Sequence, residues 1–195
     1  VVSSNLMPGL ITVHMLVALT IVGTLIYALA QSRRAFMLRQ PIDQIDPRFE
    51  RWLYIVIALT VMQVAMGTQV REMTDFISRA QGEGARSQWI AAMPWFFYVH
   101  RSFSAVLLFC NIWLTHLLTS SLGRSHSLVK MAVTMLLIIF GSVISGATLG
   151  HMGMPAFIQP THLLSASLLF GIQLLIWISY RQSRDSNTVA MSLAS

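Results

Sequence analysis

Three of the six histidines, His14, His100 and His162, stand a few residues into the start of long apolar stretches. Each is followed four positions later by a small residue: Ala18, Ser104 and Ala166. Residues i and i+4 lie on one face of a helix, so each imidazole would have cleared space beneath it. A flat, bulky ligand held by an imidazole needs such space. The pattern therefore indicates histidine-ligated haem iron.

The elements that position these histidines are predicted to cross a membrane. The chain of 195 residues is 55% hydrophobic and 10% charged, with mean hydropathy +0.65, whereas a soluble domain carries about 25% charged residues. Five apolar runs approach the ~20 residues that span a bilayer as a helix: 10–30, 52–70, 98–119, 128–149 and 160–180. None resembles a cleavable signal peptide. We predict an all-α, polytopic membrane bundle of five transmembrane helices, the last four forming a four-helix haem-binding bundle.

The basic residues predict the orientation of the spans, because cytoplasmic loops are enriched in Lys and Arg. Nine of the 13 follow the first span, follow the third span or lie in the tail: Arg33, Arg34, Arg39, Arg48, Arg51, Arg124, Lys130, Arg181 and Arg184. The other four follow the second span or begin the third: Arg71, Arg79, Arg86 and Arg101. We therefore place the carboxyl terminus in the cytoplasm or the equivalent matrix compartment. The net charge of +6 then indicates lipid-facing basic loops, and no nucleic-acid partner is expected.

The last four spans resemble two copies of one hairpin. The second and fourth spans both end in small and polar residues, Gly67-Thr-Gln and Gly146-Ala-Thr. The third and fifth both begin with a histidine. After His100 comes Arg-Ser-Phe-Ser-Ala-Val-Leu-Leu-Phe and after His162 comes Leu-Leu-Ser-Ala-Ser-Leu-Leu-Phe, alike if one residue is skipped. This weak repeat favours a bundle of two related hairpins, the alternative being convergence among membrane helices.

His100 and His162 are the main candidate ligands. The starts of the third and fifth spans lie on the outer side of the membrane if successive helices are antiparallel. Two neutral imidazoles at matched depth are a usual axial pair for low-spin haem. The alternative is two interfacial histidines that bind water or lipid. His14 also lies at the outer end, but the sequence provides no partner within its own hairpin, so ligation of a second haem and an interface role stay open.

The remaining histidines and two arginines complete the candidate set. Ordinary roles are expected for His116 and His126, whose depth does not suit an outer site, and a water-exposed or indirect role is expected for His151. Arg71 and Arg101 flank the outer mouth, where a guanidinium suits an anionic haem propionate. Arg71 is the better propionate partner, because Arg101 directly follows His100 and so points about 100° away around the helix. For both arginines the alternative is snorkelling to lipid headgroups.

A family resemblance is carried by three features of the chain. They are the run Gly67-Thr-Gln-Val-Arg71, the sequence His100-Arg101-Ser102 that opens a helix after a long outer loop, and Thr161-His162 at the last helix. Together these resemble haem A synthase over nearly the whole chain. That family has eight helices in two related four-helix halves. The resemblance implies that residues 1–32 are the last helix of an otherwise absent first half. It further implies a cytoplasmic linker at 33–51, a second half at 52–182 with outer loop 71–97, and a cytoplasmic tail at 183–195.

The resemblance also implies an activity and its cofactors. His100 and His162 would ligate the iron of haem b. His14 would belong to the first half, where haem o is the substrate and its C8 methyl is oxidised to a formyl to give haem A. The catalytic residues and the second ligand beside His14 are expected before Val1, since that residue is not an initiator methionine and five spans leave His14 unpaired. Cysteine pairs occur in outer loops of some members, but loop 71–97 has none.

Location and partners follow from the same resemblance. The chain would reside in a bacterial inner (plasma) membrane or the mitochondrial inner membrane, in contact with lipid. Haem o synthase and the respiratory oxidase complex are its expected partners. Two alternatives from other classes remain: a b-type cytochrome subunit of a quinol-linked redox complex, and a haem-free scaffold subunit for oxidase assembly.

Overall fold

The structure, a computed structural model, describes residues 9–32, 42 and 45–194, with the backbone alone for 185–194. All secondary structure in these ranges is helical. The elements are α1 (Leu10–Ser32), α3 (Arg48–Gln81), the short 3-10 helix η1 (Glu83–Gln88), α4 (Trp95–Ser121), α5 (Ser127–His151) and α6 (Ile158–Ala194). The five α-helices among these are each long and apolar enough to cross a membrane, which confirms the predicted fold class.

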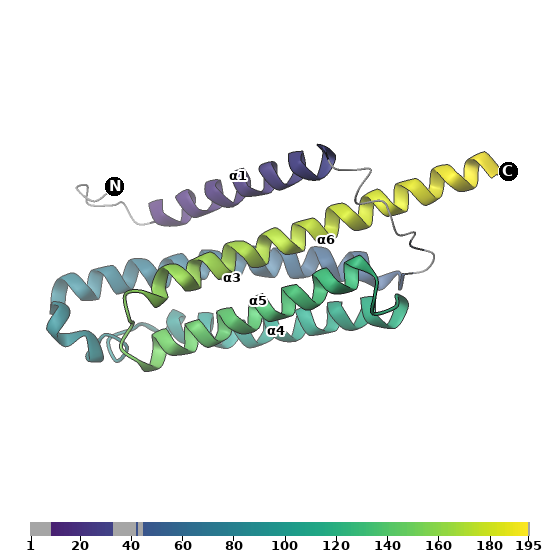
Figure 1. The fold of residues 1–195 in the computed structure, drawn as a ribbon. Helices are drawn as coiled ribbons and strands as arrows, with labels where there is room; N and C mark the ends of the chain where they lie inside the picture. Colours follow the sequence, from purple (N-terminus) through teal and green to yellow (C-terminus); the bar gives the residue numbers. More distant parts are fainter. Residues whose placement is uncertain (1–8, 33–41, 43–44, 195) are drawn as a thin grey trace.

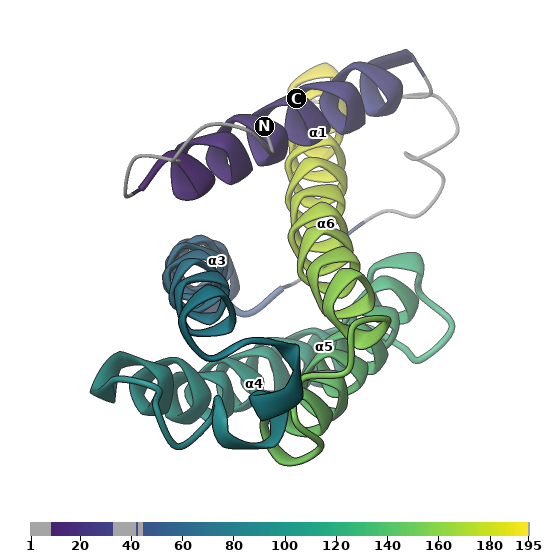
Figure 2. The ribbon, with the colours of Figure 1, turned by 90° about the vertical axis from the view of Figure 1, so that its left-hand side faces the viewer.

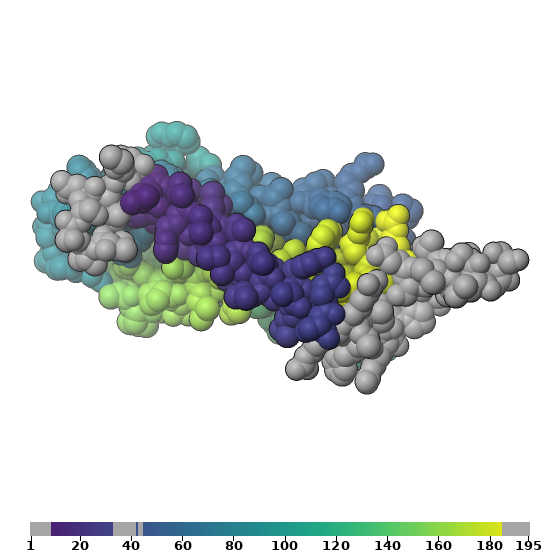
Figure 3. Space-filling model, turned by 90° about the horizontal axis from the view of Figure 1, so that it is seen from above, coloured from purple at the N-terminus to yellow at the C-terminus, as the bar shows by residue number. Residues whose placement is uncertain are grey.

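Helices α3, α4, α5 and α6 form a closed ring in which each helix contacts the next and α6 returns to α3. Figure 2 shows this ring nearly end-on, with α1 outside it, on the side away from α4 and α5. From above, α1 lies over both α3 and α6 (Figure 3). Successive helices of the ring run in opposite directions (Figure 1), so the starts of α4 and α6 lie at the same end.

The ring is held together by an apolar stripe on each helix. On α3 the buried residues recur every three or four positions, as a helix face requires: Phe49, Leu53, Val56, Thr60, Val64 and Thr68. Small residues allow α1 to approach α6. A methyl group at Gly23 would stand 3.3 Å from Leu174 Cδ2, and one at Gly171 would stand 3.1 Å from Ile26 Cδ1.

The outer connection is shorter than the predicted loop 71–97. Helix α3 continues to Gln81, and α4 already begins at Trp95. Hydropathy marks where a helix leaves lipid, whereas the α3 helix itself continues through polar residues and is supported there by the Arg71–Asp75 ion pair at 3.0 Å. The residue that follows the helix is the C-cap Gly82, whose φ of 76° suits glycine. A second apolar cluster then covers this end: Ile77, Trp89, Met93, Phe97 and Met154.

The inner end also differs from the predicted boundaries. Residues 48–51 of the predicted linker belong to α3, and the predicted tail 183–195 is helical as far as Ala194. Residues 33–41, 43 and 44 of that linker lie outside the described residues. Glu50 accepts hydrogen bonds from Arg181 and Arg184, so the start of α3 is tied to α6 beyond its apolar run.

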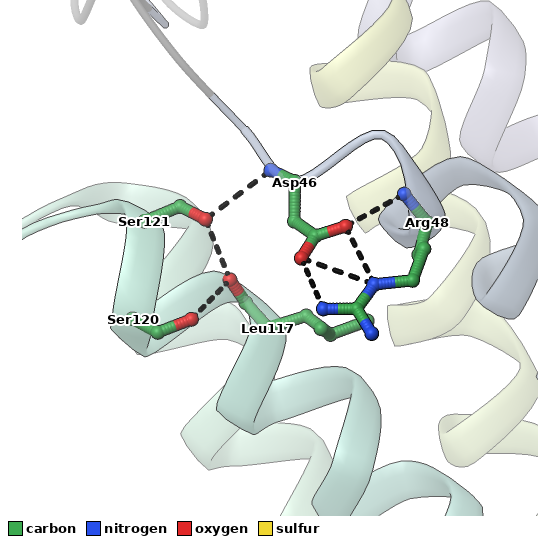
Figure 4. A network of polar contacts seen from close by, with 5 residues as sticks. All are labelled: Asp46, Arg48, Leu117, Ser120 and Ser121. Atoms are coloured by element: carbon green, nitrogen blue, oxygen red, sulfur yellow. Dashed lines mark hydrogen bonds and ion pairs between the residues drawn. The ribbon is translucent and has the colours of Figure 1, made fainter.

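Asp46 connects the start of α3 to the end of α4 (Figure 4). Its carboxylate accepts a hydrogen bond from the backbone N–H of Arg48 at 2.8 Å and forms an ion pair with the guanidinium at 2.8 Å. Its own backbone N–H donates to Ser121 Oγ at 3.2 Å. The hydrogen bonds from Arg48 lower the pKa of Asp46 to about 2. Asp46 therefore caps the first turn of α3 as a carboxylate.

Candidate functional site

His100 and His162 lie in the first two turns of α4 and α6, at the same end of the ring. Both side chains are half-buried. The antiparallel arrangement thus places the two histidines at the same end of the four helices, the matched depth that the sequence predicted.

Each imidazole rests against a glycine of the preceding helix. A methyl group at Gly67 would stand 3.2 Å from His100 Cε1 and 3.8 Å from both ring nitrogens. A methyl group at Gly146 would stand 3.1 Å from His162 Cε1, 3.6 Å from Nδ1 and 3.7 Å from Nε2. The two hairpins therefore hold their rings in nearly the same way, and a side chain larger than hydrogen at either glycine would displace the ring.

The two rings differ in the hydrogen bonds made by Nδ1. His162 Nδ1 lies 3.1 Å from the carbonyl oxygen of Ser142 and 2.9 Å from Ser145 Oγ. His100 Nδ1 is buried without a hydrogen-bond partner among the described residues. The backbone of α4 is bonded to α3 at this position, because Gln63 Nε2 donates a hydrogen bond to the His100 carbonyl oxygen at 3.0 Å.

The second ring nitrogen, Nε2, makes no hydrogen bond in either histidine within the described part of the chain. Each Nε2 is therefore able to ligate. The same residues contain no group of three or more His, Cys, Asp or Glu side chains that would hold a metal ion. Two imidazoles suit iron whose other four positions are already filled by a porphyrin. The paired rings, their glycine contacts and the free Nε2 atoms fit a bis-histidine haem.

The other histidines lie apart from this arrangement. His14 is exposed on α1, outside the four-helix ring, and His151 is exposed at the end of α5. His116 is exposed and packs its ring against Trp113, with centroids 5.6 Å apart. His126 precedes α5, and its Nδ1 accepts a hydrogen bond from Leu128 N at 3.2 Å, so it caps that helix.

The two candidate arginines are placed differently. Arg71 pairs with Asp75 on its own helix and donates from Nη1 to Gln159 at the start of α6. A propionate at this position would share the guanidinium with Asp75. Arg101 is exposed. A propionate contact stays a prediction for both residues.

Sequence reasoning missed a buried amide pair in the centre of the ring. Gln173 Nε2 donates to Asn111 Oδ1 at 3.1 Å, and both side chains are completely buried. Asn111 and Gln173 each lie eleven residues after the histidine of their helix, close to three full turns, so they share its face about 16 Å deeper. Two amide side chains at the same distance from a histidine, each within an apolar span, are a sequence signal from which this pair could have been predicted.

The contact between Ser145 on α5 and the His162 ring is a second feature that the sequence analysis did not identify.

Comparison with known proteins gives one positive result. The family described as cytochrome oxidase assembly protein (COX15-CtaA) matches residues 1–174 of the chain. Neither the curated proteins nor the solved structures contain a match.

Proposed function

The chain belongs to the COX15-CtaA family of cytochrome oxidase assembly proteins, which confirms the resemblance to haem A synthase, and from this premise we propose that its α3–α6 ring holds a haem b. The observation that carries the proposal is the pair of imidazoles at one end of the four helices, each of which lies against a glycine of the preceding helix. His100 and His162 would each donate an Nε2 lone pair to the iron. Haem b, when bound, supplies reversible one-electron transfer.

The chain's own residues perform three tasks in this site. Because Gly67 and Gly146 have no side chain, the imidazoles of His100 and His162 lie close to the backbones of α3 and α5. The apolar cluster of Ile77, Trp89, Met93, Phe97 and Met154 packs over the outer end of the ring and would restrict water there. Arg71 and Arg101 provide positive charge at the same end, which suits anionic propionates.

The reaction we assign to the protein is the four-electron oxidation of the C8 methyl of haem o to a formyl, which yields haem A for terminal oxidases and requires an external electron acceptor and a source of one oxygen atom. The family's role in oxidase assembly and the proposed haem site support this assignment. His14, exposed on α1 outside the ring of four helices, would ligate the substrate haem. His100 and His162 would hold a separate haem b, which would supply one-electron chemistry and would not itself be the substrate.

The same reasoning proposes a location and partners. Five apolar helices suit a lipid environment, and the excess of basic residues after α1, after α4 and in the tail supports a carboxyl terminus in the cytoplasm or matrix. In an inner membrane the protein would lie close to haem o synthase, which supplies its substrate, and to the respiratory oxidase, which receives haem A.

The direct test is a reduced-minus-oxidised absorbance spectrum of the purified protein. The wild type should show a low-spin bis-histidine spectrum, and His100→Ala and His162→Ala should each lose it. His116→Ala is the matched control, because His116 lies on the same helix as His100 but is exposed and packs on Trp113. An unchanged spectrum in His162→Ala, or a colourless wild type, contradicts the proposal.

The reaction requires a separate measurement. Haem extracted from cells that express the full-length protein with a haem o supply should contain haem A, identified by its mass. Unmodified haem accompanied by quinol turnover would instead support a b-type cytochrome subunit, and a protein without any haem would support a scaffold.

A further inference from the structure

We propose that Ser145 is a positioning residue that, together with the Ser142 carbonyl, holds the His162 ring with its proton on Nδ1 and makes the two candidate haem ligands unequal, an inference that rests on the proposed haem b site. Three short distances define the arrangement. His162 Nδ1 lies 3.1 Å from the Ser142 carbonyl oxygen and 2.9 Å from Ser145 Oγ. Ser145 Oγ in turn donates to the same carbonyl at 2.9 Å.

The hydrogen-bond roles follow from what each atom is able to do. The Ser142 carbonyl oxygen only accepts, so an unprotonated Nδ1 would place two lone pairs 3.1 Å apart. Nδ1 must therefore carry the proton. The hydroxyl hydrogen of Ser145 is used on that carbonyl, which leaves its lone pairs to accept from Nδ1–H. The lone pair of the neutral ring is then on Nε2, where iron would bind.

The first hairpin lacks this arrangement at the corresponding position. If Gly67 is matched with Gly146, then Gln63 corresponds to Ser142 and Met66 corresponds to Ser145. The Gln63 backbone lies beside the His100 ring, as the Ser142 carbonyl lies beside His162, but no side-chain hydroxyl bonds to the His100 Nδ1 within the described residues. A methionine thioether is at most a weak acceptor. The two hairpins thus present similar rings with different Nδ1 partners.

The difference should change the electronic character of the haem. A hydrogen bond donated by the distal ring nitrogen raises the basicity of a ligating imidazole and fixes its orientation. A more basic ligand favours ferric over ferrous iron, so it lowers the reduction potential. His162 is therefore the stronger donor of the pair, and Ser145 sets part of the potential at which this haem exchanges electrons.

The test compares two serines on one helix. Ser145→Ala removes a hydroxyl that contacts His162, whereas Ser142→Ala leaves the carbonyl oxygen in place. Redox titration followed by absorbance should give Ser145→Ala a higher potential than the wild type with haem retained. Ser142→Ala and the conservative Ser145→Thr should keep the wild-type potential. Met66→Ser, which offers a hydroxyl to His100, should lower it.

A wild-type potential in Ser145→Ala, or an equal shift in Ser142→Ala, would overturn the inference. Nitrogen-15 NMR of the imidazoles in haem-free protein tests it independently of haem loading and of every variant's folding. We expect His162 with its proton on Nδ1, and a proton on Nε2 would refute the assignment. A wild type that never binds haem would refute the proposed function, while the NMR result would still report the tautomer.

Discussion

Replacing Gly146 by alanine tests whether α5 must lie directly against the His162 ring. The new methyl carbon would stand 3.1 Å from His162 Cε1. Carbon atoms in contact prefer about 3.5–4.0 Å, so the ring would have to retreat by about 0.5 Å. Overpacking of this kind costs about 1–3 kcal/mol. Because ~1.4 kcal/mol corresponds to a factor of ten in affinity, we expect haem b to bind roughly tenfold more weakly.

A second effect of the same substitution has the opposite sign. Alanine within a helix is favoured over glycine by about 0.8–1 kcal/mol, so Gly146→Ala should strengthen α5 itself while weakening haem binding. Gly141→Ala separates these effects. Gly141 lies on the same helix, and a methyl group there would meet nothing within 4 Å. The Gly141→Ala variant therefore gains helix propensity without adding a contact with His162.

The assay is titration of haem into the haem-free proteins, with dissociation constants taken from the absorbance change. The ratio of constants for Gly146→Ala and Gly141→Ala isolates the contact with the ring. Gly67→Ala should resemble Gly146→Ala, since its methyl group would stand 3.2 Å from His100 Cε1. Equal affinity in the Gly146 and Gly141 variants would show that contact with glycine does not position the imidazoles for haem binding, which would contradict the proposed site.

Two further predictions concern stability, measured by denaturant unfolding in detergent. Asn111→Leu should cost about 1–3 kcal/mol because it leaves the buried amide of Gln173 without a partner, and adding Gln173→Leu should cost less than the sum of the single changes. Asp46 has a folded pKa of about 2 against an ordinary 3.8, so its stabilising effect is present above about pH 4 and lost as the pH falls through 2. Asp46→Asn should abolish that part of the acid dependence, and an unchanged acid profile would argue against the cap.

Hydropathy was sufficient to predict the number of spans, because the cost of exposing polar backbone to lipid leaves few alternatives to a long apolar helix. It was insufficient for helix ends. Helix α3 continues from residue 70 to Gln81 through polar sequence, where Arg71–Asp75 and the apolar contacts of Ile77 stabilise a helix outside the apolar run. Such contacts depend on residues distant in sequence, which a window of hydropathy does not include.

The depth of the two histidines was also predictable, since it follows from their positions near helix starts and from antiparallel packing. Their surroundings were not. Sequence placed Gly67 and Gly146 among small residues at helix ends, but only the packed ring shows that each glycine faces a histidine of the next helix. Ser145 is a similar case: a small polar residue suits helix packing as well as a hydrogen bond, and the fold decides between them.

The contacts give the weak sequence repeat a geometric counterpart. Convergence among apolar helices would produce similar composition. It gives no reason for each imidazole to point Cε1 at a glycine, where an added methyl carbon would stand 3.2 Å from His100 Cε1 and 3.1 Å from His162 Cε1. Nor does it explain why the polar residues eleven positions further on bond to each other across the ring. A pair of related hairpins accounts for both. In such a pair, positions that differ, such as Met66 and Ser145, are where the two halves of the site acquire different chemistry.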